Sequence, residues 1–147
     1  MYTGLLHTHS LLRYFVLLML VIVVAGSLLK WASNKPYGRL DDKASLYLLI
    51  FTHLQLLAGL ILYIVSPFVQ FNSGTMSEKM TRYWTIEHIT LMLLAIALIT
   101  VARIRTKKAP DDRTRHLRTW MLNGIALLIV LISIKMSGRG IIHPGLF

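Results

Sequence analysis

Four stretches of mostly apolar residues run through this chain, and each is long enough to cross a bilayer as a helix. A transmembrane helix needs about 20 such residues, because it rises about 1.5 Å per residue through a hydrocarbon layer about 30 Å thick. The stretches cover residues of about 5–30, 44–66, 83–103 and 119–136. The pattern predicts an all-α polytopic membrane protein, in which residues 1–147 form a single domain, an antiparallel bundle of four transmembrane helices.

The residues at the edges of these stretches indicate where two of the helices end. Lys30 and Trp31 close the first stretch, as snorkelling and aromatic side chains do at a membrane interface. Pro67 cannot continue a helix and ends the second. Each stretch is apolar nearly all round, so only its few polar residues can indicate which face turns inward.

Composition supports the membrane class over a nucleic-acid partner. The chain has 16 Lys and Arg against 6 Asp and Glu, a formal net charge of +10, but only 15% of its residues are charged and 55% are hydrophobic. A nucleic-acid-binding domain of this charge would spread its basic residues over a polar surface. Cys is absent, which excludes disulfides, thiolate zinc sites, iron–sulfur clusters and covalently attached haem.

The basic residues predict the orientation in the membrane. Four Lys and Arg residues lie between positions 30 and 43 and seven between 103 and 118, whereas five lie on the other side. The positive-inside rule therefore places these two connections in the cytoplasm and both termini outside. Membrane lipids with anionic headgroups are the expected partners of these residues.

The histidines within the spans are the main candidates for chemistry, because ionisable side chains inside a membrane are costly. His9 and His88 each lie about one turn inside the outer edge, roughly 6 Å deep at the helical rise. His53 lies about 10 Å above the inner edge by the same rise. His9 and His88 are therefore the pair expected to meet.

Two imidazoles on facing helices of a bundle are what a six-coordinate b-type haem requires. Arg13 lies one turn from His9 on the same face and is a candidate partner for a haem propionate. His53 is the substitute ligand if the helices are offset. The chain contains no CxxCH, so this haem would be non-covalent.

Several alternatives remain open at this stage. His88 can instead hydrogen-bond a neighbouring helix, with His9 as an interfacial residue. A zinc or copper site would need ligands from an outer group made of His7, His9, Glu87, His88 and His143.

Three further polar residues have simpler interpretations beside a functional one. The negative charge of Glu87 is favoured at a helix N-terminus. Its functional alternatives are pairing with Arg13 and proton transfer to a quinone. Gln55 and His53 lie on different helix faces, so interhelical hydrogen bonding is favoured over binding of a quinone headgroup. His116 lies among arginines and is expected to be solvated or lipid-facing.

Three stretches carry a resemblance to a known group: LLHTHSLLRYFVL at 5–17, THLQLLAGLILYIVSP at 52–67 and IEHITLMLLAIALIT at 86–100. They resemble small four-span membrane proteins of Bacteroidetes-type bacteria that are commonly labelled cytochrome b-like. The resemblance covers nearly the whole chain, and its motifs include His9, Arg13, His53, Gln55, Pro67, Glu87 and His88. The final residues, KMSGRGIIHPGLF, depart from the Trp- and Pro-rich tail expected of that group.

The resemblance and the histidines together predict a multi-pass protein of the bacterial inner membrane that binds haem b and takes part in electron transfer, with quinone as a candidate partner. A cofactor-free accessory subunit of a larger membrane complex is the alternative, and an ion or metal carrier is a third. A homo-oligomer is compatible with the remaining apolar surface. The chain lacks hydrolase, transferase and dinucleotide-binding motifs, so a redox component is the one enzymatic role considered.

Overall fold

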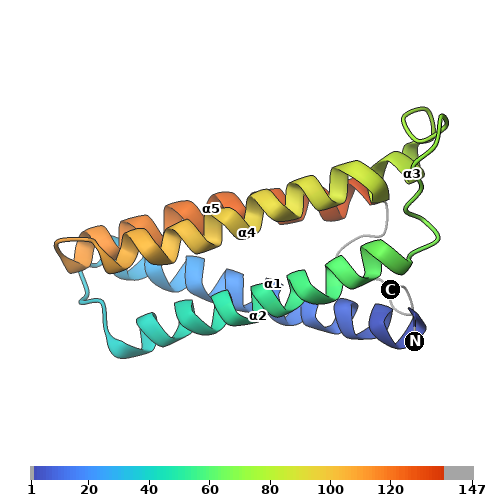
Figure 1. The fold of residues 1–147 in the computed structure, drawn as a ribbon. Helices are drawn as coiled ribbons and strands as arrows, with labels where there is room; N and C mark the ends of the chain where they lie inside the picture. Colours follow the sequence, from blue (N-terminus) through green and yellow to red (C-terminus); the bar gives the residue numbers. More distant parts are fainter. Residues whose placement is uncertain (1, 138–147) are drawn as a thin grey trace.

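The computed structural model describes residues 2–137 and is helical. The elements are α1 (Tyr2–Ala32), α2 (Arg39–Val65), α3 (Lys79–Arg82), the π-helical turn η1 (Tyr83–Glu87), α4 (His88–Lys107) and α5 (Asp112–Met136). Since α3, η1 and α4 follow one another without a break, the described chain has four long helices, as Figure 1 shows. All four are long and apolar enough to cross a membrane, which indicates a multi-pass membrane protein.

The helices extend beyond the apolar stretches from which they were predicted. The third long helix runs from Lys79 to Lys107, and α5 begins at Asp112, about two turns before its apolar part. Asp111 explains this start, because its side chain accepts a hydrogen bond of 2.7 Å from the Thr114 N–H and caps the helix. Apolar length marks the part of each helix within the hydrocarbon, whereas capping sets where the helix itself begins.

The helices pack side by side along most of their length. α1 packs against both α2 and α5, and α4 packs mainly against α5, whereas α2 and α4 share the loosest of these contacts. The start of α1 and the connection 66–78 lie at one end of the bundle, which we call the N-terminal end (Figure 1). The connections 33–38 and 108–111 lie at the opposite end, which we call the basic end.

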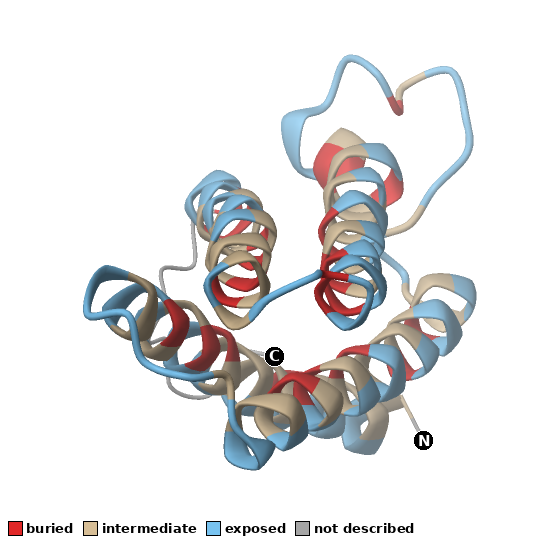
Figure 2. Cartoon of the chain, turned by 90° about the vertical axis from the view of Figure 1, so that its left-hand side faces the viewer, coloured by how far each residue is buried: buried red, intermediate tan, exposed pale blue. Residues whose placement is uncertain are grey.

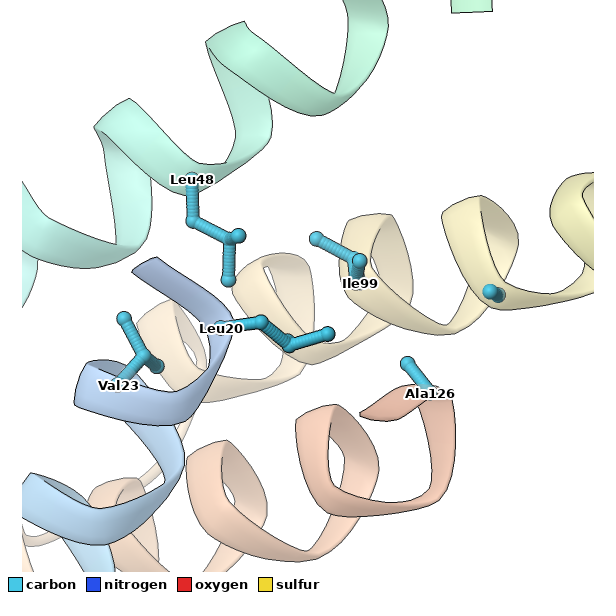
Figure 3. Close-up of a cluster of buried hydrophobic side chains, with 6 residues drawn as sticks. Leu20, Val23, Leu48, Ile99 and Ala126 are labelled. Atoms are coloured by element: carbon cyan, nitrogen blue, oxygen red, sulfur yellow. The ribbon is translucent and has the colours of Figure 1, made fainter. Parts of the chain in front are cut away.

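A small apolar core joins the four helices near the middle of the bundle. Leu20 of α1, Leu48 of α2 and Ile99 of α4 are at most 3% exposed and lie close to one another and to Ala126 of α5 (Figure 3). The buried bands of the helices turn toward one another, and the exposed bands turn outward (Figure 2). Many of the outward residues are large and apolar, as expected of a surface that contacts lipid.

At the basic end, His116 is fully buried, so the prediction of a solvated or lipid-facing residue is wrong. The connection 33–38 covers it: the ring of Tyr37 lies 5.0 Å from the His116 ring, and the Pro36 carbonyl oxygen lies 3.2 Å from His116 Nε2. Burial of the Tyr37 hydroxyl is the main cause that raises its pKa, and the negative charge of Asp42 is the second. Several arginines lie close to His116 in the sequence, but α5 turns the His116 side chain toward the inside of the bundle.

Ion pairs at the basic end join α2 to α1 and to α4. Lys30 Nζ lies 2.6 Å from Asp41 Oδ1. Arg103, whose side chain is only 10% exposed, donates to the Asp42 carbonyl oxygen at 3.1 Å and lies 3.5 Å from its carboxylate. The paired acidic residues in the first turn of α2 therefore balance charge and hold helices together.

We expect Leu20→Ala to destabilise the bundle by about 2–5 kcal/mol, because it leaves a cavity where four helices meet. Leu18→Ala is the matched control, since Leu18 lies two residues away on the same helix and is 58% exposed. Thermal unfolding in detergent, followed by far-UV circular dichroism, measures both. Equal losses for the two variants would contradict this assignment of the core.

Candidate functional site

The π-helical turn η1 leads directly into His88 at the N-terminal end of the bundle. The His88 N–H donates to the Tyr83 carbonyl oxygen five residues earlier, so the helix is locally wider than an α-helix. Tyr63 of α2 donates its hydroxyl to the Thr85 carbonyl oxygen, and the Gln70 N–H donates to Thr85 Oγ1 at 3.0 Å. These contacts fix the turn against α2 and the connection 66–78. Turns of this kind are frequent at functional sites.

Tyr83 and Ser133 hold the ring of His88 from one side. Tyr83 Oη donates to the Ser133 carbonyl oxygen at 2.7 Å, which uses its only proton. His88 Nδ1 lies 3.3 Å from Tyr83 Oη and 3.4 Å from Ser133 Oγ. In the tautomer with the proton on His88 Nδ1, this nitrogen donates to Tyr83 Oη and the lone pair is on Nε2.

His9 faces His88 from α1. The ring centroids lie 6.5 Å apart with 75° between the ring planes. His9 Nε2 lies 3.4 Å from the side-chain amide of Gln55, while His9 Nδ1 and Gln55 Oε1 are buried without a hydrogen-bond partner. With the amide turned so that Oε1 accepts from His9 Nε2–H, the lone pair resides on His9 Nδ1. One Gln side chain can thus orient His9 as Tyr83 orients His88.

Gly59 of α2 makes room for the His9 ring. A Cβ atom at this position would lie 3.1 Å from His9 Cε1 and 3.6 Å from His9 Nδ1. The first distance is closer than ordinary van der Waals contact, so a larger residue would push the imidazole away. The glycine lets the imidazole lie directly against the backbone of α2.

Two adjoining cavities, of about 130 and 110 Å³, surround the pair of histidines. Both are bounded by His9, Arg13, Gly59, Tyr63, Trp84 and His88. The larger one continues toward the apolar core between residues of all four long helices. It also reaches the lipid-facing surface between α2 and α4, where the exposed residues Leu60 and Leu93 form part of its wall.

Arg13 brings a positive charge to both cavities. Its Nη2 is buried without a hydrogen-bond partner, and its guanidinium lies 4.7 Å from the centre of the Tyr14 ring. Within residues 2–137, no carboxylate forms an ion pair with Arg13. A buried guanidinium favours an anionic partner, so this residue can bind an acidic group of a ligand.

Glu87 does not provide that anionic group. Its Oε1 lies 2.7 Å from Arg82 Nε, one turn earlier on the same helix. The hypothesis that Glu87 pairs with Arg13 is therefore wrong. The carboxylate joins α3 to the end of η1 instead.

The structure does not bring the remaining candidates into this site. His53 is exposed on α2, where its Nδ1 lies 2.8 Å from the Leu49 carbonyl oxygen. His7 is exposed, and His143 lies outside the described residues. In the described part of the chain, no three His, Asp or Glu side chains gather closely enough to hold a metal ion.

The residues that sequence reasoning missed are Tyr83, Ser133 and Gly59. Tyr83 and Ser133 lie beside the His88 ring, and Gly59 lies beside the His9 ring. All three residue types are common in membrane spans, so none stands out in the sequence. Tyr83 and Ser133 are 50 residues apart in the chain, so no local pattern could join them.

Comparisons of this chain with models of protein families, with curated proteins and with solved structures gave no match.

We expect Gly59→Ala to lower stability by roughly 1–3 kcal/mol, because the new Cβ overpacks the His9 ring. The same change in a His9→Ala background should cost little, since the ring is gone. Gly124→Ala is the control, because its Cβ would lie 3.9 Å from Val24 Cγ1, an ordinary contact. Thermal unfolding of the four variants in detergent gives the comparison. Equal effects of Gly59→Ala with and without His9 would rule out this contact.

Proposed function

We propose that this protein is a membrane-embedded b-type haem protein that takes part in electron transfer, with His9 and His88 as the axial ligands. The observation that carries the proposal is the 6.5 Å separation of the two imidazole rings across the bundle. A metal–imidazole bond is about 2 Å long, so two rings on opposite sides of one ion have centroids roughly 6 Å apart. The observed separation agrees with this value.

The groups around the two rings suit the same cofactor. With the proton on His88 Nδ1, Tyr83 holds that nitrogen and Nε2 carries the lone pair, and Gln55 orients His9. Such hydrogen bonds to the non-ligating nitrogen fix an axial imidazole and adjust its basicity. The apolar side chains of the larger cavity supply the surroundings that a macrocycle requires.

Arg13 is proposed to bind a haem propionate, which would satisfy its buried Nη2. Bound haem supplies one-electron chemistry at its iron. Because the larger cavity reaches the lipid-facing surface at Leu60 and Leu93, a membrane-dissolved quinone is the proposed redox partner. His53, exposed on α2, is not needed for this arrangement.

The proposal includes an orientation in the bacterial inner membrane. We propose an antiparallel bundle whose two termini lie outside and whose basic end lies in the cytoplasm, as the Lys and Arg distribution predicts. The haem would then lie near the outer side. The resemblance to cytochrome b-like proteins supports the haem, whereas the orientation rests on the Lys and Arg distribution alone.

Substitution of the proposed ligands provides the test. We expect His9→Ala and His88→Ala each to reduce the haem-to-protein ratio at least tenfold, because a single remaining imidazole would not hold the group in place. His53→Ala, a histidine of the same bundle outside the cavities, should keep the wild-type ratio. The ratio is measured on detergent-purified protein expressed with added haem precursor, with helicity checked by circular dichroism. Full haem occupancy in His88→Ala would overturn the assignment.

A wild-type chain that is colourless under these conditions would favour the cofactor-free accessory subunit. The hydrogen bonds of Tyr83 to Ser133 then serve only to join α5 to η1. The next experiment in that case is to look for proteins that copurify with the chain.

A further inference from the structure

A second site lies at the basic end of the bundle, far from the two histidines. A groove of about 290 Å³ between α4 and α5 is lined by Val101, Ile104, Arg105, Lys108 and Arg118. Val101, Ile104 and Arg105 lie on one face of the third long helix, and Lys108, directly after its last residue, continues the spacing of i, i+3, i+4 and i+7. Apolar and basic residues therefore follow one another along a single groove.

The three cations of this groove lack acidic partners. Three other basic residues of the region have one: Arg103 lies beside Asp42, Arg115 beside Asp112 and Lys30 beside Asp41. Arg105, Lys108 and Arg118 form no ion pair with a carboxylate in residues 2–137. Because no acidic residue lines the groove, their charges are not compensated within it.

Arg118 is fixed in place by the backbone of α4. Its Nη1 donates to the Arg105 carbonyl oxygen at 2.8 Å, which is in the last turn of that helix. A guanidinium has five N–H donors, so most remain for another acceptor. The hydrogen bond orients one cation toward the two on α4.

The order of residues along the groove matches the order of groups in a phospholipid. Val101, near the end of the apolar stretch, and Ile104, just beyond it, are exposed and would contact an acyl chain. Arg105 and Lys108 come next, at the end of the helix where the hydrocarbon gives way to headgroups. Basic pockets between transmembrane helices are suited to anionic headgroups.

We propose that this groove binds the headgroup of one anionic phospholipid, with its phosphate between Arg105, Lys108 and Arg118 and an acyl chain along Val101 and Ile104. The site depends on the membrane location of the chain and is independent of the proposed haem. It is more specific than a general attraction of the basic end to acidic lipids, since it excludes Lys107. That residue is exposed on the same turn but does not line the groove.

Lys107 and Lys108 provide a matched pair of variants. Each substitution by Gln removes one charge from the end of α4, so both change the net charge and the helix terminus equally. We expect Lys108→Gln to weaken binding of phosphatidylglycerol about fivefold, the effect of one Lys near a membrane surface. Lys107→Gln should change it less than about twofold on the same scale.

The measurement is native mass spectrometry of the full chain in a neutral detergent, titrated with phosphatidylglycerol or with phosphatidylcholine. The wild type should retain phosphatidylglycerol in preference to phosphatidylcholine, and Arg105→Gln combined with Lys108→Gln should abolish the preference while circular dichroism stays unchanged. Equal weakening by Lys107→Gln and Lys108→Gln would overturn the site in favour of general attraction. Displacement of the lipid by inorganic phosphate at equal concentration would overturn it in favour of a free anion.

Discussion

Polar side chains held within a hydrocarbon layer must find partners inside the protein, because lipid tails offer no hydrogen bonds. This requirement organises the N-terminal end of the bundle. His88 is held by Tyr83, His9 lies against Gly59 and faces the amide of Gln55, and the two rings meet 6.5 Å apart. Near the two rings, His9 Nδ1 and Arg13 Nη2 are among the buried atoms of the described chain that have no hydrogen-bond partner. The proposed haem would supply iron for the first and a propionate for the second.

The sequence predicted the four long helices well, since a run of about 20 apolar residues indicates a helix that can cross a membrane. Counting residues from the ends of these runs also predicted that His9 and His88 would meet. Their side chains do face each other in the structure. The supporting residues were not predictable, because helices that are apolar all round carry no signal of how they rotate against one another. No local sequence pattern indicates the π-helical turn before His88 or the contact of Ser133 with His88.

Two expectations for polar residues were wrong. The arginines near His116 suggested solvent or lipid, and the hypothesis that Glu87 pairs with Arg13 overlooked Arg82, one turn before it. The structure buries His116 beneath the connection that carries Tyr37 and pairs Glu87 with Arg82. Which neighbour matters depends on the face of the helix, and for α5 the packing against α1 and α4 decides which face is buried. The apolar core around Leu20 separates this basic end from the histidines, so the two ends can serve different ligands.

The most direct test of the central claim is the optical spectrum of the detergent-purified wild-type chain, expressed with adequate haem supply, before and after addition of dithionite. Two imidazole ligands predict a low-spin haem, with a Soret band in the oxidised protein and sharp α and β bands after reduction. A featureless visible spectrum, with no haem released on extraction, would contradict the account.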